Sequence, residues 1–405
     1  MEENFIMNNS EQSVNLEKRI KRHIKAQFHD FFCVVPPGFE ETARRELSLL
    51  GVSCSEEKIV GGIEFEGKLE DCYKVNFLSR ILARVLMRIT EFKATNFRVL
   101  YKKSLTVPWE LYLPSGANVG FSIESVRSRL YHKGAIEEEF KKTISERFKT
   151  FNLDVSFNEE KDVDIRVFVR FENDKALISV DTTGTPLYKR GYKTYTASAP
   201  LRENLAAAIL IEAGIEKKEF LIDPMCGSAT FSIESFLIKN KIPAGLKRSF
   251  SFEKFPSFSE KSFNFFKRKI IEEADKNSKE NGVSFSIIAF DKDPKAVELA
   301  EKNIKNIESE NKIEILNSDF FDYKFEIREP SKTLVVLNPP YGKRLSEKNA
   351  IATYNKIGLK LKKNFNGVSY AVIIPSSFSS KINIPFDKRL KFKHGGISAE
   401  VRIKF

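Results

Sequence analysis

The stretch from Val335 to Gly342 constrains this chain most, because an apolar strand runs directly into two consecutive prolines. Each proline lacks a backbone N–H and fixes its own φ, so the strand must end in a stiff, extended loop rather than a helix. Asn338 and the Pro339 carbonyl then offer acceptor oxygens to a planar amine, and Tyr341 offers a ring for stacking. The alternative interpretation is a rigid turn after a buried strand.

Acceptors in such a loop suit the methylation of an exocyclic nucleobase amine. The lone pair of that amine is delocalised into the ring, and two acceptors on its hydrogens favour the reactive, pyramidal form. The same oxygens stabilise the positive charge that grows on nitrogen, while the stiff loop supplies alignment. The sequence therefore predicts a catalytic element made of Asn338, Pro339, Pro340 and Tyr341.

An earlier segment carries the pattern of a nucleotide pocket. The apolar stretch 220–222 is followed by the small-residue loop Asp223–Thr230 and then by a helical pattern. Strand, tight loop and helix start in that order are typical of a doubly wound sheet, in which the backbone approaches the ligand closely. Gly227 and Ser228 leave room for that approach.

Two further strands end in acidic residues. Asp291 follows the strand 286–290 and is placed to accept two ribose hydroxyls, whereas Asp293, before a proline, is predicted to cap the next helix. Asp319 follows the strand 313–316 and can accept an adenine amino group, with Phe320 or Phe321 against the ring; the alternative is an ordinary turn. Four strand-end signals in this order indicate one cofactor site.

Together with the stretch 199–208, these motifs resemble the class I S-adenosylmethionine-dependent methyltransferases, and more closely the THUMP-containing RNA guanine-N2 methyltransferases that act on bacterial 23S ribosomal RNA. The resemblance extends from about Asp30 onward. It implies an α/β, Rossmann-like domain with a doubly wound sheet, preceded by an α+β ferredoxin-like and THUMP module that binds RNA. It also implies that S-adenosylmethionine is held by Pro200, Asn204, Asp223, Cys226, Gly227, Ser228, Thr230, Asp291 and Asp319.

The chain departs from that family in two ways. Ala229 stands where a second glycine is usual, which is tolerable at negative φ but would crowd a cofactor otherwise. Some relatives carry a second methyltransferase domain, whereas this sequence ends at Phe405, so we expect no second activity here.

The pattern predicts three regions: a charged extension (1–29), the ferredoxin-like and THUMP module (30–185) and the methyltransferase domain (186–405). The extension has no periodic core face. In the module, the stretch 164–171 alternates as a half-buried strand, and Asn173-Asp174 turns the chain into a partner strand.

Two clusters interleave basic and aromatic residues, the first within 127–133 and the second within 188–193. Cations of this kind hold phosphates and tyrosines stack on unpaired bases. The alternatives are a solvated loop for the first cluster and a hinge for the second. The predicted RNA-binding residues are Arg127, Arg129, Tyr131, Lys133 and Arg190, with Lys343 and Arg344 beside the target base.

The connection 242–280 is unusually long and rich in phenylalanine, lysine and arginine. It is either a wall facing the target base or a helix packed on the sheet. We expect most of its phenylalanines to pack and its exposed basic residues to contact RNA.

The net charge of +12 favours a polyanionic partner, although a composition rich in Lys, Asn, Ile and Phe weakens that signal. The four cysteines lack metal-ligand spacing, and no stretch is apolar enough for a signal peptide or a membrane span. We therefore expect a cytoplasmic protein without metal or membrane partners.

The function favoured by these signals is methyl transfer from S-adenosylmethionine to guanine N2 in RNA, with 23S ribosomal RNA or a ribosomal precursor as the substrate. Rival interpretations are the same chemistry on tRNA, or on adenine N6, because Asn338-Pro339-Pro340-Tyr341 accepts either amine. A rival of another class is a non-catalytic RNA-binding assembly factor, for which Ala229 is the hint.

Overall fold

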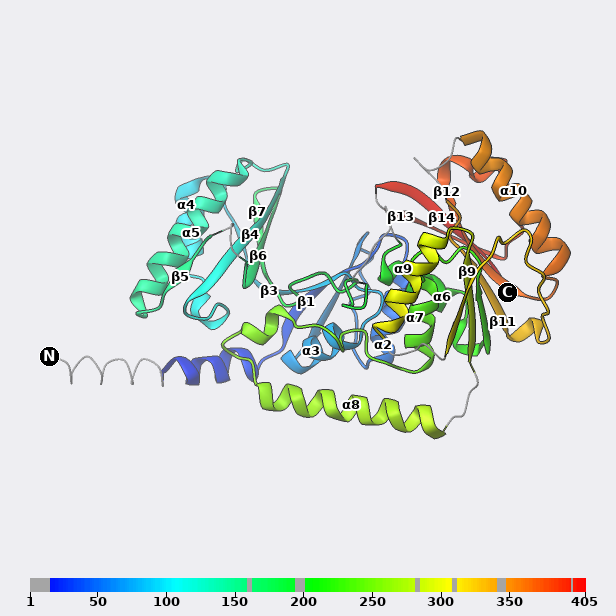
Figure 1. The fold of residues 1–405 in the computed structure, drawn as a ribbon. Helices are drawn as coiled ribbons and strands as arrows, with labels where there is room; N and C mark the ends of the chain where they lie inside the picture. Colours follow the sequence, from blue (N-terminus) through cyan, green and yellow to red (C-terminus); the bar gives the residue numbers. More distant parts are fainter. Residues whose placement is uncertain are drawn as a thin grey trace.

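The computed structural model describes residues 15–158, 162–193, 201–280, 285–307, 312–340, 347–394 and 396–405, and places them around two seven-stranded sheets (Figure 1). The first sheet belongs to the N-terminal half of the chain and the second to the C-terminal half. Four residues that the sequence assigns to the site, Pro200, Tyr341, Lys343 and Arg344, lie outside the described residues.

The N-terminal sheet is mixed, and its long strand β3 joins two parts. One end of β3 pairs with β1 and the rest pairs with β7, both antiparallel. Helices α2 (Glu40–Leu49) and α3 (Leu69–Leu78) accompany the first part, and α4 (Phe97–Leu105) and α5 (Lys133–Thr150) accompany the second. The strand order is β2 (Gly62–Gly67), β1 (His29–Val34), β3 (Arg84–Lys93), β7 (Lys175–Asp181), β6 (Ile165–Glu172), β4 (Ala117–Val126), β5 (Val155–Ser156).

The alternation predicted for 164–171 is confirmed. Ile165, Val167, Val169 and Phe171 are all buried on one face of β6. Asn173 and Asp174 both adopt positive φ, 51° and 64°, as a tight hairpin turn requires.

The C-terminal sheet is doubly wound. Its first five strands in spatial order are parallel, whereas β14 runs antiparallel to both of its neighbours. Helices α6 (Glu203–Glu212), α7 (Thr230–Lys239) and α9 (Pro294–Lys305) cover one face, and α10 (Glu347–Asn364) covers the other. The strand order is β10 (Ile313–Asn317), β9 (Ser286–Asp291), β8 (Phe220–Asp223), β11 (Thr333–Leu337), β12 (Ser369–Pro375), β14 (Ile397–Lys404), β13 (Lys388–His394).

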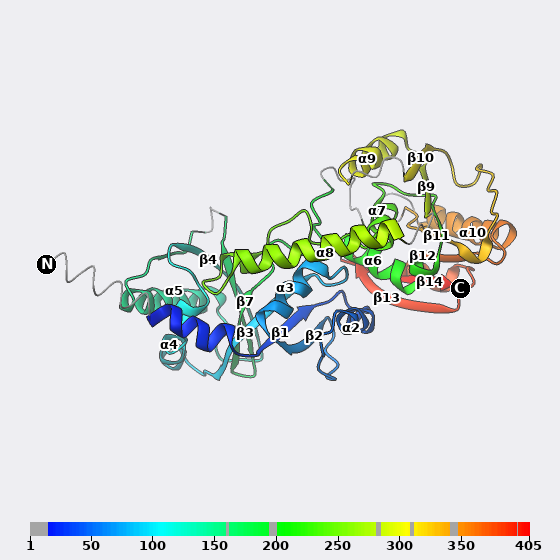
Figure 2. The ribbon, with the colours of Figure 1, turned by 90° about the horizontal axis from the view of Figure 1, so that it is seen from below.

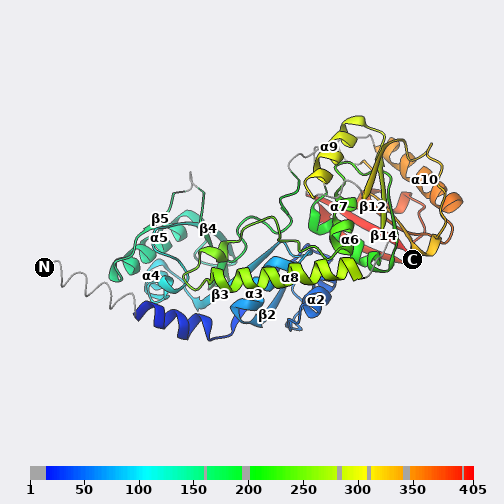
Figure 3. The same cartoon turned by 60° about the horizontal axis from the view of Figure 1, so that its bottom comes forward.

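The segment 242–280 joins the two halves. It contains the 3₁₀ turn η4 (Ser251–Lys254) and the long helix α8 (Glu260–Glu280), which lies beside α3 in Figures 2 and 3. Phe252 stacks on Tyr73 of α3, with 4.3 Å between the ring centroids, and Phe263 meets Phe77 edge to face at 6.0 Å. Packing of these phenylalanines is therefore confirmed, but their partner is the N-terminal half rather than the methyltransferase sheet.

The described part of the N-terminal extension has a core face, contrary to the expectation from its sequence. Ile20 and Ile24 are buried, and Arg19 donates a hydrogen bond of 2.6 Å to Glu110. The two isoleucines are four residues apart and so share one face of a helix. Two buried positions are too few to stand out in a charged sequence.

Candidate active site at the carboxyl edge of the C-terminal sheet

The strand order of the C-terminal sheet reverses between β8 and β11. From β8 the chain continues to β9 and β10 on one side, and then returns to β11 on the other. Ile222 of β8 is in register with Val335 of β11, so the loops after Asp223 and Leu337 leave neighbouring parallel strands at the same edge. In open α/β sheets this reversal point opens a crevice for ligands at the carboxyl ends of the strands.

Asn338 is the first residue beyond β11. Its side-chain oxygen is buried and has no hydrogen-bond partner among the described residues, and Pro339 beside it is also buried. A buried acceptor without a partner costs about 1–3 kcal/mol unless a ligand supplies a donor. The continuation of this loop, from Tyr341 on, lies outside the described residues.

Asp223 and Asn204 also carry buried oxygens that have no hydrogen-bond partner in the described ranges. One carboxylate oxygen of Asp223 accepts a hydrogen bond of 2.8 Å from Ser232, while the other has none. Burial raises the pKa of Asp223 to about 7. The amide nitrogen of Asn204 donates to the Ile81 carbonyl at 3.1 Å, which leaves its oxygen without a donor.

Gly227 and Asp291 hold the loop Asp223–Thr230 in place. Gly227 adopts φ +55°, and its N–H donates to one carboxylate oxygen of Asp291 at 3.0 Å. The other oxygen of Asp291 accepts from the Asp293 N–H at 3.0 Å. Each oxygen retains a second lone pair for a ribose hydroxyl. The position where a Gly227 Cβ would stand faces open space, so a ligand can approach the backbone.

Most of the other residues of the loop Asp223–Thr230 are buried. Cys226, Ser228 and Thr230 are between 3% and 8% exposed, and burial raises the pKa of the Cys226 thiol well above its ordinary value. Ala229 adopts φ +60°, not the negative φ at which alanine is unstrained. Its methyl group lies in the hydrophobic core, so it packs against protein instead of crowding the cofactor side.

Asp293 caps α9, as predicted, since its side chain accepts a hydrogen bond from the Lys295 N–H at 3.0 Å. Asp319 accepts from the Phe321 N–H at 2.8 Å, which is the geometry of an ordinary turn, and one oxygen remains for a ligand. Phe320 is only 2% exposed and packs in the core, so it is not available to a base; Phe321 is half-buried.

The first basic and aromatic cluster is exposed on the loop before α5. The side chains of Arg129 and Tyr131 are 74% and 76% exposed. Arg127 pairs with Glu172 at 2.7 Å and Arg129 with Asp174 at 3.6 Å, so both guanidiniums are held near the hairpin turn of β6 and β7. Lys133 is exposed at the start of α5.

The RNA role predicted for Arg190 is wrong. Its side chain is 3% exposed; it donates to the Leu187 and Arg80 carbonyls and lies 3.6 Å from Glu234. The second cluster is thus a junction between the two halves, and Tyr192 completes it by donating to Glu234 at 2.9 Å. Glu234 escaped prediction because an acidic residue inside a helix pattern carries no local signal of such a role.

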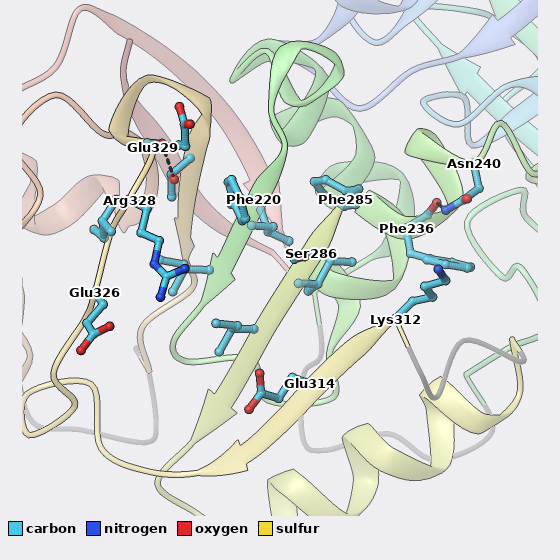
Figure 4. A pocket seen from close by; sticks show the side chains of 16 residues that line it. Phe220, Phe236, Asn240, Phe285, Ser286, Lys312, Glu314, Glu326, Arg328 and Glu329 are labelled. Carbon is cyan, nitrogen blue, oxygen red and sulfur yellow. Dashed lines mark hydrogen bonds between the residues drawn. The ribbon is translucent and has the colours of Figure 1, made fainter. Parts of the chain in front are cut away.

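A cavity of about 750 Å³ lies at the opposite edge of the same sheet (Figure 4). Its lining includes the strand starts Phe220, Ser286 and Thr333, which are amino ends, as well as Asn240 at the end of α7. It is therefore separate from the strand ends that carry Asp223, Asp291 and Asn338. Among the described residues, no cluster of His, Cys, Asp and Glu is arranged for a metal, and no helix is long and apolar enough to cross a membrane.

Three family descriptions match successive parts of the chain. Residues 30–86 match the RlmL ferredoxin-like domain, residues 94–181 match the THUMP domain, and residues 190–384 match the RMKL-like methyltransferase domain. Two curated relatives are both named ribosomal RNA large subunit methyltransferase K/L. The one from Methylococcus capsulatus is 34% identical over 85% of this chain and 46% of its own, and the one from Syntrophotalea carbinolica is 32% identical over 92% and 53%. The chain spans about half the length of these relatives.

Solved structures match over nearly the whole chain. The crystal structure of SMU.472, titled as a putative methyltransferase complexed with SAH, has a TM-score of 0.82 and 28% identity, covering 94% of this chain and 98% of its own. A structure from Listeria monocytogenes, titled as a predicted N6-adenine-specific DNA methylase, has a TM-score of 0.77 and 25% identity, covering 94% and 97%. TrmN from Thermus thermophilus shares the fold, with a TM-score of 0.64 at 16% identity over 93% and 99%.

Proposed function

Because this chain joins a THUMP domain to an RMKL-like methyltransferase domain, we propose that it transfers a methyl group from S-adenosylmethionine to the N2 amine of a guanine in RNA. The substrate we propose is 23S ribosomal RNA or its precursor particle, in the cytoplasm. The relatives named as large-subunit ribosomal RNA methyltransferases support that choice. We also propose the division at residues 29 and 185 given by the sequence.

The observation that carries the proposal is the buried, unpartnered oxygen of Asn338 at the reversal point of the sheet. In this mechanism, that oxygen and the Pro339 carbonyl each accept one N–H of the target amine. The two bonds orient the nitrogen lone pair away from the acceptors and stabilise the charge that develops on nitrogen. The guanine must leave its stack to reach this edge.

The residues around Gly227 fit S-adenosylmethionine, which supplies an electrophilic methyl group on its sulfonium. Asp291 would hold the ribose hydroxyls, and Asp319 the adenine amino group. Asn204 and Asp223 bring acceptor oxygens that lack donors, and the space beside Gly227 admits a ligand against the backbone. Pro200, Cys226, Ser228 and Thr230 complete the proposed cofactor set.

Arg127, Arg129, Tyr131 and Lys133 would bind the RNA at a distance from the target base. Their exposure on the loop before α5 supports this role. Lys343 and Arg344, which follow the catalytic element in sequence, would hold phosphates beside the target. Arg190 is withdrawn from the set.

The test uses the purified full chain, S-adenosylmethionine with a labelled methyl group, and ribosomal and transfer RNA from cells that lack the protein. We expect label in N2-methylguanosine of 23S RNA, identified by mass spectrometry of nuclease digests. Asn338→Ala should slow incorporation by about 10²–10³, whereas Asn240→Ala, at the opposite edge of the sheet, should leave its rate unchanged. RNA binding without incorporation by the wild-type chain would instead indicate an assembly factor.

One observation favours a second candidate, methylation of adenine N6. The Listeria structure titled as an N6-adenine-specific methylase matches this chain with a TM-score of 0.77, and the two acceptors at Asn338 and Pro339 suit either amine. Label in N6-methyladenosine in the same digests would replace guanine by adenine as the target.

A further inference from the structure

The hairpin of β13 and β14 extends past the edge of the sheet that carries Asn338. Leu337, the last residue of β11, is in register with Val372, and β12 continues to Pro375, which pairs with Ala399. The pair Lys393 and Ser398 comes one step further along the hairpin. The hairpin turn therefore overhangs the candidate active site, and Figure 1 shows the hairpin reaching toward the N-terminal half.

One face of β13 is committed to the interior. Phe392 packs against Phe39, with 5.6 Å between the ring centroids, and Lys388 forms an ion pair with the buried Glu212. Between these residues the N-terminal half touches the strand itself, because a Cβ on Gly38 would stand 1.9 Å from the Lys391 carbonyl oxygen. The hairpin is thus held by contacts with both α6 and the N-terminal half.

The other face of β13 presents three exposed cations, Arg389, Lys391 and Lys393. None of them forms an ion pair within the part of the chain that the structure describes. The carboxylate nearest in register is Glu400, opposite Lys391, but it is buried and accepts hydrogen bonds from Ser379 at 2.8 Å and Arg402 at 2.9 Å. The three charges therefore remain available to an external anion.

We propose that Arg389, Lys391 and Lys393 bind the backbone phosphates of the RNA strand next to the target nucleotide. The inference rests on the proposed function. Alternate residues of a strand are about 6.8 Å apart, comparable with successive phosphates of an extended nucleic-acid strand. β13 is three strands from β11, about 14 Å, so these phosphates belong to nucleotides close to the methylated base. A rigid platform binds them with little loss of conformational entropy.

The test compares two triple variants of the full chain. In the first, Arg389, Lys391 and Lys393 are changed to glutamine. In the matched control, Lys356, Lys362 and Lys363 of α10 are changed to glutamine; these are also exposed, but α10 leads back to the start of β12 and so ends near the opposite edge of the sheet. The affinity for a 23S RNA fragment is measured by fluorescence anisotropy over a range of KCl concentrations, and SAH affinity by calorimetry.

We expect the hairpin variant to bind RNA at least tenfold more weakly, and the slope of log Kd against log salt to fall by about 2, since each lost contact to single-stranded RNA removes about 0.7. The control should keep most of the slope, and both variants should bind SAH as the wild type does. An unchanged slope in the hairpin variant would overturn the inference, as would an equal fall in both variants. Self-association of the hairpin variant with unchanged RNA binding would also overturn it, because the cations would then only protect an edge strand. Failure of the proposed function would be seen separately, as the absence of methyl transfer to RNA by the wild-type protein.

Discussion

In the N-terminal half, the buried carboxylate of Glu110 accepts hydrogen bonds from Arg19 and Arg147, whereas at the edge of the C-terminal sheet the buried oxygen of Asn338 has no partner within the described part of the chain. The same contrast holds for Asp181, paired with Arg84, and Asp223, half of whose carboxylate lacks a donor. The carboxylates of Glu110 and Asp181 therefore hold segments of the first region together. The free oxygens of Asn338 and Asp223 instead carry a cost in stability that a ligand donor would relieve.

The largest expected effect comes from breaking a satisfied group. Glu110→Ala leaves two guanidiniums facing a buried gap, and should lower the free energy of unfolding by about 3–5 kcal/mol. Trp109, the sole tryptophan in the chain, is buried next to Glu110, so its fluorescence during urea denaturation reports the change. The control, Glu298→Ala, removes an exposed ion pair with Lys302 and should change the free energy of unfolding little, because solvent screens both charges. Equal losses of unfolding free energy in the two variants would contradict the stabilising role assigned to Glu110.

The next effect is on rate. Asn338→Ala should reduce kcat by about 10²–10³, or about 2.7–4 kcal/mol, without lowering the free energy of unfolding, because the oxygen it removes has no partner among the described residues. Asn338→Asp keeps an acceptor oxygen on this side chain and should retain measurable transfer. Kinetics and urea denaturation of the same preparations check both parts. A marked loss of stability in the alanine variant would reveal a structural role for this oxygen.

A pH effect should follow from Asp223. Because burial raises its pKa from 3.8 to about 7, the folded protein holds this proton more tightly than the unfolded chain does. The stabilisation is complete below the unfolded pKa and is lost as pH rises through the folded value, by about 2–3 kcal/mol between pH 5 and pH 8. Asp223→Asn should lack this component. The difference between the two denaturation profiles isolates it, and a difference of opposite sign would contradict the assignment.

A smaller effect concerns the cofactor. Asp291→Ala removes the acceptor for the Gly227 N–H and for the proposed ribose hydroxyls, and should weaken SAH binding by about 1–3 kcal/mol. Asp293→Ala is the matched control, since it removes only the cap of α9 and should cost about 1 kcal/mol of stability. Calorimetric titration with SAH measures the affinity of both variants and so distinguishes loss of a ligand contact from loss of a helix cap. Unaltered SAH binding by the Asp291 variant would place the ribose site elsewhere.

The smallest effect should come from an exposed residue of the N-terminal half. Arg129→Gln should weaken RNA binding only a few-fold and lower the salt slope by about 0.7, since its side chain is 74% exposed and already shares an ion pair. Lys103→Gln, on α4, supplies an exposed control. A much larger loss of RNA affinity in the Arg129 variant would contradict this expectation, because it would show that single residues of the N-terminal half contribute strongly to RNA binding.

Several elements could be predicted because their signals are local. The Asn173-Asp174 hairpin turn and the Asp293 cap depend on residues a few positions apart, and both are confirmed. The edge that carries Asp223 and Asn338 was also predictable, since parallel strands of a doubly wound sheet end together.

Other features depended on partners far away in the chain. Arg190 looked like a phosphate-binding residue beside tyrosines, but Arg80 and Glu234 enclose it. The left-handed backbone of Ala229 could not be anticipated either, because its strain is tolerated only where the surrounding core fixes the loop.

The sequence alone determined the order of strands and loops and the chemistry at each strand end, because periodicity and proline, glycine and aspartate act over short distances. Only the tertiary structure decided that the phenylalanines of 242–280 meet α3, and that Arg389, Lys391 and Lys393 lie at the edge of the sheet that carries Asn338. Burial and exposure of such residues depend on which distant segment packs against them, and a pattern within one segment carries no record of that partner.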